Sequence, residues 1–448
     1  MNENLDKDRH YIGLFNIGGN QFQGEIVHNV KNGVILLSVK FEVDMDFFEK
    51  SIQNYINHSV IIGKLTNGTV VNLYGNTCIK NHLYNFQYHE LQYIVKYMIW
   101  SNKEFPNPQF DKITCEIENG LNWSGLTEID IKEFSNFLLK KNEPKTFFWY
   151  NAQITFSTSI NNELLNLPRK EVCEITERLI ISIESDEKKD IVFFTGVRDK
   201  ILSMISFAIR DNVNVIQQYF TDYNDFYDIG EYKKYQEYFL IDNDPEHNIY
   251  DNDILYYNFF LKNLPQDDPQ LSEDLEKLAP IFNLYLSLFK YPYMPTEMIF
   301  LNIVQALETF HSRFFYNNDK KEYLQSVEER FEKDSLCYKL LLSDTQMDKN
   351  HNYIILVSRL NDLLIRGKDD LFKKFYQKNY AQKIADTRHY YTHYGENKRD
   401  KALKGDVLNN SIQILRLLLE YHVCAILNID ISKRVAGDLL RNNSIECD

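Results

Sequence analysis

The sequence lacks the features that mark a secreted, membrane-embedded or zinc-ribbon protein. Its six cysteines are dispersed without a Cys-x-x-Cys pair, which argues against a zinc ribbon or a disulfide framework and fits a reducing compartment. No run of about 18 apolar residues occurs, so we expect no membrane-spanning helix. The first residues are charged and lack the apolar core of a secretory signal. We therefore expect a soluble, cytoplasmic protein.

Positive charge is also scarce, because 50 Lys and Arg residues against 64 Asp and Glu residues leave a net charge of −14. Such a chain does not coat nucleic acid non-specifically, so any nucleic-acid site has to be a local basic patch. Glycine is rare, and the single pair Gly18-Gly19 lacks phosphate-loop spacing and predicts a turn. Apolar residues, in contrast, make up 44% of the 448 residues, enough for two or three domains with cores.

Residues 1–262 have the pattern of a β-rich domain, with short apolar or alternating segments between turn residues. Asn32-Gly33 and Asn67-Gly68 predict tight hairpins, because both residue types tolerate positive φ. Many short strands favour a sandwich-like fold, with helical interruptions expected at Asp46–Tyr55, Glu90–Met98 and Val197–Arg210. The expected strands are Tyr11–Gly19, Phe22–His28, Val34–Val39, Asp111–Glu118, Lys145–Ser159, Arg178–Ile183 and Asp190–Thr195.

Residues 222–253 are acidic and aromatic, with ten Asp or Glu residues against Lys233 and Lys234. Two Asp-Asn-Asp triplets in this stretch lack the glycine and the glutamate that complete a calcium loop. We interpret residues 222–262 as an acidic connector that ends the N-terminal domain. It would serve as a solvated link, as a surface for a partner, or as a shield for a basic site in the next domain.

From residue 263 the hydrophobic period changes from 2 to 3.6, which predicts an all-α domain over 263–448. Ser272-Glu273-Asp274 and Pro295-Thr296 have the composition of helix starts. Short connections between amphipathic helices predict an antiparallel bundle, and hence an α+β multidomain chain. The expected helices are 272–290, 295–316, 320–333, 335–342, 352–365, 369–378, 380–394, 407–427 and 432–441.

One stretch of this domain concentrates reactive side chains: Asp386-Thr387-Arg388-His389-Tyr390-Tyr391-Thr392-His393-Tyr394. At about 100° per residue, His389 and His393 lie about 40° apart on one helix face, together with Asp386. Arg388 and His393 are about 140° apart, but the long arginine and an unwound last turn allow their ends to converge. RNA supplies its own 2′-hydroxyl nucleophile. A histidine that transfers protons and a guanidinium that stabilises phosphate charge therefore suit RNA cleavage without a metal.

The same stretch resembles a known family. Arg, a polar residue, three further residues and then His is the motif of the HEPN ribonucleases, and the nine residues are most similar to the Apea-like HEPN branch of bacterial anti-phage proteins. That branch usually has Asn after the Arg, where this chain has His389. The resemblance implies a helical domain that cuts RNA as a homodimer through its C-terminal domain, without a cofactor, and leaves a cyclic phosphate.

The resemblance also implies residue roles and a biological role. Arg388 and His393 would be the catalytic pair, with His389 and Asp386 orienting them. The β-rich domain would sense an unknown phage-derived trigger. We therefore expect an endoribonuclease effector of abortive-infection defence.

A basic patch overlaps the motif. Between residues 373 and 404, nine basic and three acidic residues leave a local charge of +6. Lysines interleaved with tyrosines provide the phosphate attraction and base stacking that a single-stranded RNA groove requires, although such a run alone would indicate a solvated face. The expected RNA-binding residues are Lys373, Lys374, Lys378, Lys383, Lys398 and Arg399.

Three alternatives remain open at this point. Asp386, His389 and His393 could ligate zinc in a hydrolase, although no Glu follows the first His. The histidines could be hydrogen-bonded structural groups, and the helical domain a non-catalytic module that binds RNA or protein. On the preceding helices, Glu308, His311 and Arg313 could contact the motif helix, and a buried ion pair is the favoured role for them.

Overall fold

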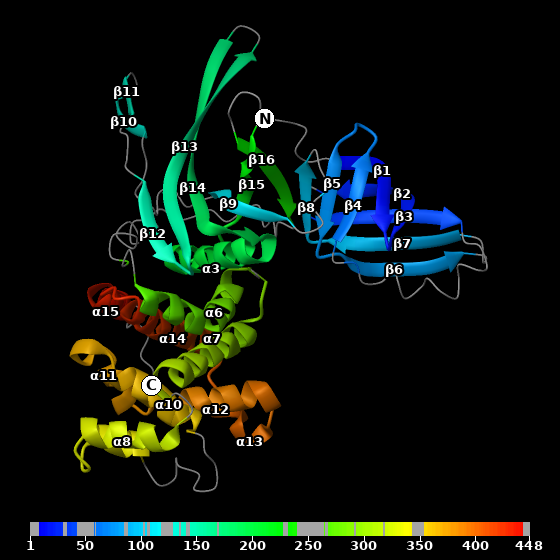
Figure 1. Ribbon diagram of the computed structural model, residues 1–448. Coiled ribbons are helices and arrows are strands. Elements are labelled where there is room, and N and C mark those ends of the chain that lie inside the picture. The colour runs from blue at the N-terminus through cyan, green and yellow to red at the C-terminus, as the bar shows by residue number, and fades with distance from the viewer. Residues whose placement is uncertain are drawn as a thin grey trace. The chain divides into compact units, whose positions relative to one another are not determined.

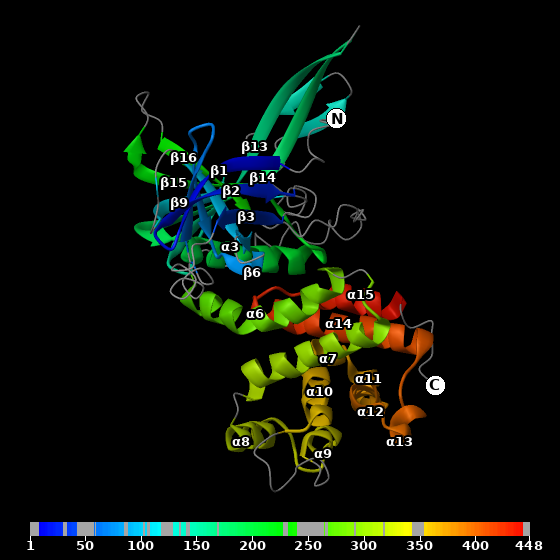
Figure 2. The ribbon, with the colours of Figure 1, turned by 90° about the vertical axis from the view of Figure 1, so that its right-hand side faces the viewer.

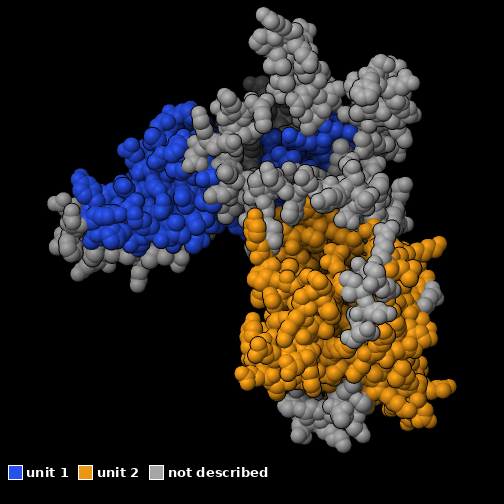
Figure 3. Space-filling view, turned by 180° about the vertical axis from the view of Figure 1, so that it is seen from behind, with its two compact units in different colours: residues 1–202, 213–256 blue, residues 203–212, 257–448 orange. Residues whose placement is uncertain are grey.

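The structure is a computed structural model that describes residues 9–29, 34–42, 58, 60–84, 88–101, 104, 108–117, 129–133, 136–139, 144–167, 170–226, 232–239, 264, 268–290, 293–316, 319–342 and 354–441. Its packing separates into one unit of residues 1–202 and 213–256 and another of residues 203–212 and 257–448 (Figure 3). The first unit is built mainly of strands and the second of helices, which confirms the expected α+β fold. Residues 203–212 pack with the helical unit, although the sequence-based boundary lies at 262/263.

The strands of the first unit pair antiparallel, in the sheet order β12-β13-β14-β9-β15-β16-β8-β5-β4-β1-β2-β3-β7-β6, and β10 pairs with β11 (Figure 1). They are β1 (Arg9–Ile17), β2 (Asn20–His28), β3 (Ile35–Glu42), β4 (Val60–Leu65), β5 (Val70–Tyr74), β6 (Thr77–Tyr84), β7 (Tyr88–Val95), β8 (Tyr97–Ser101), β9 (Gln109–Ile117), β10 (Ile129–Glu133), β11 (Asn136–Leu139), β12 (Lys145–Trp149), β13 (Ala152–Leu167), β14 (Lys170–Asp190), β15 (Val215–Phe226) and β16 (Tyr232–Phe239).

The strands from β1 to β8 enclose one core. Met98 on β8 and Tyr93 on β7 come from strands far apart in the sheet order, yet both are fully buried in the same hydrophobic cluster. The sheet therefore curls over on itself, as expected for a sandwich-like domain. Phe15 lies at its centre against Gly63, where an added Cβ would approach the phenylalanine ring to 2.4 Å.

The predicted turns are confirmed where the structure describes them. Gly18 and Gly19 have φ of 61° and 84° and join β1 to β2 in a tight hairpin. Asn67-Gly68 lies in the turn between β4 and β5, with φ of 88° at the glycine, as the hairpin pattern predicts. Asn32-Gly33 lies outside the described residues.

Two of the expected secondary-structure elements are wrong. Residues 90–98 form strands β7 and β8 rather than a helix, because Leu91, Tyr93 and Val95 alternate at period two towards the core. Residues 191–195 begin helix α3 (Ile191–Ile209) rather than a strand, since the Asp190 carboxylate accepts a hydrogen bond from Phe193 N at 2.8 Å, as an N-cap does. The same helix confirms the one predicted at 197–210, and the helix predicted at 46–55 lies outside the described residues.

The acidic connector is also corrected over its described part. Residues 222–226 belong to β15 and residues 232–239 form β16, so this part is a hairpin of the sheet. Its alternating aromatic and polar residues pair as strands, and Phe220 is fully buried. Asp222 is buried and forms an ion pair with Lys188 instead of facing solvent.

The second unit contains the predicted helices with small shifts at their ends. Helix α7 packs against both α6 and α14 (Figure 2). The helices are α6 (Pro269–Lys290), α7 (Thr296–His311), the π-helix η2 (Ser312–Tyr316), α8 (Lys320–Arg330), α9 (Leu336–Leu342), α10 (Leu356–Ile365), the 3-10 turn η3 (Lys368–Asp370), α11 (Lys373–Gln377), α12 (Tyr380–His393), α13 (Glu396–Arg399), α14 (Gly405–Ile426) and α15 (Ser432–Arg441). No helix in the described ranges is long and apolar enough to span a membrane.

Buried polar contacts fix the helices of this unit to one another. Glu420 on α14 accepts hydrogen bonds from Tyr285 on α6 at 2.6 Å and from Arg210, just after α3, at 2.5 and 3.0 Å. Burial raises the pKa of Tyr285, whereas the nearby guanidinium of Arg210 holds the pKa of Glu420 below its usual value despite complete burial. The last residues of α3 are thus bonded into the helical unit.

Candidate functional site

Helix α12 carries the Arg-x4-His motif, and its two ends are set by left-handed residues. Asn379 precedes it with φ of 56°, and Tyr394 follows it with φ of 50°. Tyr394 N donates to Tyr390 O at 2.6 Å, and the left-handed conformation of Tyr394 ends the helix at His393, two residues before Gly395. A left-handed tyrosine is uncommon, so the chain accepts some strain where the motif ends.

The inner face of α12 holds the segment that follows it. Leu403 N donates to Thr387 Oγ1 at 3.0 Å, and Tyr391 OH donates to Leu403 O at 2.9 Å. Burial raises the pKa of the Tyr391 hydroxyl, which keeps it a neutral donor. These bonds fold residues 395–404, including α13, back across the helix.

That fold brings Asp386 to Lys398. The carboxylate of Asp386 is only 8% exposed, and it accepts hydrogen bonds from Lys398 Nζ on α13 and from Gln382 Nε2 at 3.2 Å. Both donors contact Oδ1. Asp386 therefore joins α12 to α13 through an ion pair with Lys398. Helical spacing alone placed Asp386 beside the histidines and did not predict this pair.

The outer face of α12 carries Arg388, His389 and His393. The rings of His389 and His393 lie 4.9 Å apart between centroids, which confirms that the two residues share one face. Both histidines are exposed and Arg388 is half-buried. Within the described ranges, none of these three side chains has a hydrogen bond or an ion pair, so their polar groups are available to a ligand.

The predicted RNA-binding residues divide into paired and unpaired cations. Lys373 forms an ion pair with Asp370 at 2.8 Å, and Lys398 is held by Asp386. Lys374 lies over the Phe375 ring, with Nζ 4.7 Å from the centroid. The exposed side chains of Lys378, Lys383 and Arg399 have no hydrogen bond or ion pair within the part of the chain that the structure describes.

The cations are spread along α12 instead of clustering at the histidines. Lys373, Lys374 and Lys378 precede the helix, whereas His393 is its last residue, and 14 residues of α-helix span about 20 Å. Next to the motif, Lys404 Nζ lies 5.8 Å from the Tyr390 ring centroid. This arrangement suits an extended polyanion along the helix better than a single small anion.

The zinc alternative receives no support from this geometry. Among the described residues, no group of three His, Cys, Asp or Glu side chains is placed to hold a metal ion. Asp386 directs an oxygen to Lys398, as described above, while the two histidines are exposed on the outer face. The motif therefore offers two imidazoles and a guanidinium, and the acid is engaged elsewhere.

A buried polar cluster involves one of the residues on the preceding helices. His311 Nε2 on α7 lies 3.0 Å from Asp362 Oδ2 on α10, and both side chains are fully buried. Arg330 and Arg366 donate to the other oxygen of Asp362 at 2.9 and 3.0 Å. Burial lowers the pKa of His311, so a neutral imidazole donates to the carboxylate. Hydrogen bonds and these cations hold the pKa of Asp362 well below its usual value.

This cluster joins α7, α8 and α10, and no residue of α12 takes part in it. Asp362 was not identified from the sequence, because it lies 51 residues beyond His311 and nothing local links them. Arg313, in contrast, is exposed and donates to the backbone O of Lys277 at 3.3 Å. A buried polar contact does exist at His311, as a hydrogen bond from a neutral imidazole rather than the predicted ion pair, and its partner Asp362 was not revealed by the sequence.

Comparison with protein-family models finds a match for each of the two units. Residues 10–267 match the model of ApeA N-terminal domain 1, and residues 301–430, which include the motif, match the model of Apea-like HEPN. No curated protein and no solved structure matches the chain. The first model alone spans more than half of the sequence, and the second falls where the helical motif lies. The chain therefore belongs to the ApeA-type HEPN proteins, a family of anti-phage effectors whose HEPN domain is of a nuclease type.

Proposed function

We propose that the protein is a metal-independent endoribonuclease that cleaves RNA at the outer face of α12. The observation that carries the proposal is the pair of half-buried Arg388 and exposed His393, whose side chains have no polar partner among the described residues and lie in a net positive region. HEPN domains generally act on RNA and often dimerise, which agrees with this arrangement.

The chemistry follows from the groups present. The neutral imidazole of one His393 takes the proton of the 2′-hydroxyl, and the 2′-oxygen forms a bond to phosphorus as the bond from phosphorus to the 5′-oxygen breaks. Arg388 donates to the phosphate oxygens, whose negative charge increases in the transition state. The leaving 5′-oxygen receives a proton from the partner's His393, and the products are a 2′,3′-cyclic phosphate and a 5′-hydroxyl.

His389 and Asp386 act as positioning residues in this proposal. The ring of His389 lies beside that of His393, so it restricts the orientations that His393 can take. Asp386 acts indirectly, because its ion pair with Lys398 holds α13 next to the motif helix. Lys378, Lys383 and Arg399, together with Lys373, Lys374 and Lys398, attract the RNA backbone along the helix.

A dimer completes the active site in this proposal. Three exposed apolar side chains lie near the motif helix along the chain or on an element that packs against it: Met298 on α7 is 47% exposed, Tyr394 after α12 is 67%, and Val407 at the start of α14 is 39%. The ring of Tyr391 contacts Phe300 of α7, and its hydroxyl donates to Leu403, four residues before Val407. A second copy that covers the three exposed side chains would bring its own motif helix to the first. Exposed apolar side chains near a charged motif are what such an interface requires.

The β-rich unit would then control the nuclease. It would sense a phage-derived trigger and release cleavage of RNA as abortive-infection defence. Its strands carry no motif that predicts an enzyme.

The test is cleavage of purified cellular RNA by the full-length chain in EDTA, with the fragment ends analysed. We expect fragments with cyclic phosphate ends, and no cleavage by Arg388→Ala or His393→Ala. If the parent binds RNA without cutting it, the chain is the non-catalytic module instead. Activity that EDTA removes and zinc restores would establish the metal alternative.

The dimer is tested separately by light scattering on the full-length chain. Tyr394→Asp and Met298→Asp should shift the mass towards monomer, whereas Leu440→Asp, at an exposed position on α15, should not. A parent that is monomeric at the concentration of the cleavage assay would contradict the composite site. Mixing inactive Arg388→Ala and His393→Ala subunits should restore part of the cleavage if each site draws on both copies.

A further inference from the structure

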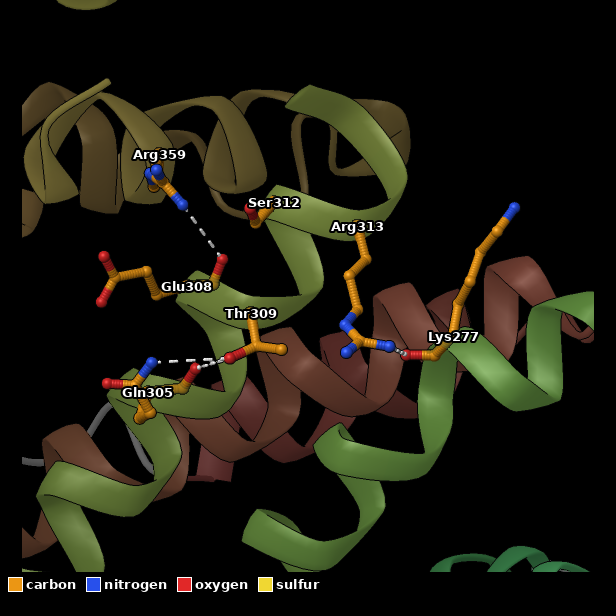
Figure 4. Close-up of a pocket in the computed structure, with 7 residues that line it drawn as sticks. All are labelled: Lys277, Gln305, Glu308, Thr309, Ser312, Arg313 and Arg359. Atoms are coloured by element: carbon orange, nitrogen blue, oxygen red, sulfur yellow. Dashed lines mark hydrogen bonds between the residues drawn. The ribbon is translucent and has the colours of Figure 1, made fainter. Parts of the chain in front are cut away.

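A second candidate site lies in the helical unit, where a pocket of about 410 Å³ is lined by α6, α7, η2 and α10 (Figure 4). None of its lining residues belongs to α12 or α13. Three are cations, Lys277, Arg313 and Arg359, and one is a carboxylate, Glu308. Its neutral lining residues are Gln305, Thr309 and Ser312.

Arg359 is the residue that distinguishes this pocket from a surface hollow. It is only 9% exposed, and its guanidinium donates to two backbone carbonyls, Ile354 O at 2.9 Å and Glu308 O at 3.4 Å. No carboxylate of the described residues pairs with it. A buried guanidinium with only neutral acceptors is unfavourable unless an anion reaches it.

The same helix provides a comparison. Arg366, seven residues further along, bonds to the buried carboxylate of Asp362 at 3.0 Å. The fold therefore pairs the partly buried Arg366 with an acid and leaves the more deeply buried Arg359 to face the pocket. Arg359 also lies against the Tyr316 ring, with Cζ 5.3 Å from the centroid, which fixes its position without neutralising it.

The remaining groups add positive charge and hydrogen-bonding capacity. Figure 4 shows Arg359 and Glu308 at one side of the pocket, Arg313 and Lys277 at the other, and Ser312 between them. Lys277 Nζ is 3.7 Å from Asp274, a partly exposed and therefore weak pair. The main chain also widens here from α-helix to π-helix at Ser312, and such widened turns are frequent at functional sites.

We propose that this pocket binds a small phosphate ester that carries free hydroxyl groups. The phosphate lies between Arg359 and Arg313, where it is attracted from both sides. The carboxylate of Glu308, which has no partner among the described residues, accepts hydrogen bonds from the hydroxyls. The pocket volume lies in the range of small-molecule sites and fits a molecule the size of a sugar phosphate. This inference concerns binding alone and does not depend on the nuclease activity.

The experiment measures thermal unfolding and calorimetric binding of the full-length chain at fixed ionic strength, with ribose 5-phosphate, inorganic phosphate and ribose as probes. Ribose 5-phosphate should raise the melting temperature and bind more tightly than inorganic phosphate, and ribose should do neither. Arg313→Ala and Arg359→Lys should each weaken ribose 5-phosphate at least tenfold. Glu308→Gln should weaken ribose 5-phosphate but leave inorganic phosphate unchanged.

Lys321→Ala, which removes an exposed cation on α8 away from the pocket, is the matched control and should bind as the parent does. If it weakens binding as much as Arg313→Ala, the effect is one of general charge and the site is wrong. Absence of binding by all three probes, or unchanged binding in Arg313→Ala and Arg359→Lys, would overturn the proposal. If Arg359→Lys does not fold, the binding measurement on Arg313→Ala, a substitution at an exposed residue, decides the outcome.

Discussion

At the scale of single residues, Arg388 and His393 are expected to act as one unit. Neither side chain is bonded within the described structure, so Arg388→Ala and His393→Ala should abolish RNA cleavage and leave the melting temperature within about 1 °C of the parent. The double variant should be hardly worse than either single one, because a catalytic unit is lost as a whole.

The control for this prediction is Thr392→Ala on the same exposed turn, whose hydroxyl only donates to Arg388 O at 2.7 Å. It should keep most of the activity. Cleavage by His393→Ala at the parental rate would remove the basis of the assignment.

The second prediction concerns His389, where the family usually has Asn. If His389 acts only by packing its side chain beside His393, His389→Asn should retain most of the rate and the whole pH profile. His389→Ala, which leaves a gap beside His393, should lose about tenfold or more in kcat. The pH dependence of the cleavage rate decides between the two roles of His389. If His389→Asn loses the fall in rate on one side of the pH optimum, His389 itself transfers a proton.

The sequence predicts some of this site and misses the rest for a physical reason. Helical spacing is local, so the shared face of His389 and His393 follows from the sequence alone. The bond from Asp386 to Lys398 depends on how residues 395–404 fold back, and that return is set by Thr387 and Tyr391. Helical periodicity alone gives no information about how the segment after the helix folds back against it.

At the scale of elements, helices were easier to predict than the boundaries of strands. The period of 3.6 persists through each helix of 263–448, whereas residues 90–98 have a strand pattern interrupted at Lys96 that was mistaken for a helix. For residues 222–226 and 232–239 the sequence points to a connector, because acidic content suggests solvent exposure, whereas the structure has strands there. Phe220 and Asp222 show that an acidic strand can still pack in a sheet when an acid is paired.

Helix packing leads to a third prediction, on pH. Burial lowers the pKa of His422 on α14 to about 4, and His311 is shifted in the same direction. In the unfolded chain a histidine titrates near 6.5, so between about pH 6.5 and 4 the unfolded state binds protons that the folded state does not. Stability should therefore fall as the pH drops below about 6.5, by roughly 3 kcal/mol for His422 alone at pH 4.

Urea denaturation at pH 7.5, 6 and 5 checks this. His422→Gln keeps a donor for Leu363 O, which His422 Nε2 approaches to 2.8 Å, and should reduce the pH dependence. A free energy of unfolding that stays constant from pH 7.5 to 5 would contradict the prediction.

The fourth prediction concerns the contact that anchors the end of α3. The side chains of Arg210 and Glu420 are 7% and 5% exposed, so removing Arg210 leaves the buried Glu420 with the bond from Tyr285 and a longer contact of 3.6 Å to Arg416. Arg210→Ala should lower the free energy of unfolding by about 3 to 5 kcal/mol. Arg313→Ala, at an exposed arginine of the same unit, should cost less than about 1 kcal/mol. Equal losses of unfolding free energy in the two variants would show that the buried contact between Arg210 and Glu420 stabilises the fold no more than an exposed arginine does.

At the scale of the whole molecule, one helix belongs to both units. Residues 191–202 of α3 pack with the β-rich unit, and residues 203–209 pack with the helical unit. Residues 203–209 lead directly to Arg210, which bonds to Glu420 of the helical unit. For the same reason, a nuclease fragment that begins at residue 263 would lack Arg210, and functional tests belong on the full chain.

The last prediction is that the acidic stretch restrains the nuclease. A free ribonuclease would damage its own cell, and the acids of 222–253 are opposite in charge to the patch at Lys373–Lys404. Competition with RNA phosphates would be electrostatic and should weaken as salt rises. Asp222 is left unchanged in the test, because it is buried against Lys188 and its loss would harm the sheet.

Replacing the other acids of the stretch with Asn and Gln should raise basal RNA cleavage and toxicity in cells, because the patch is then open to RNA. The increase should be largest at low salt and should vanish when Arg388→Ala or His393→Ala is combined with it. The matched control replaces an equal number of exposed acids in the helical unit, such as Glu328 and Glu329 on α8. If the neutralised chain is as inactive as the parent, restraint does not act through these charges.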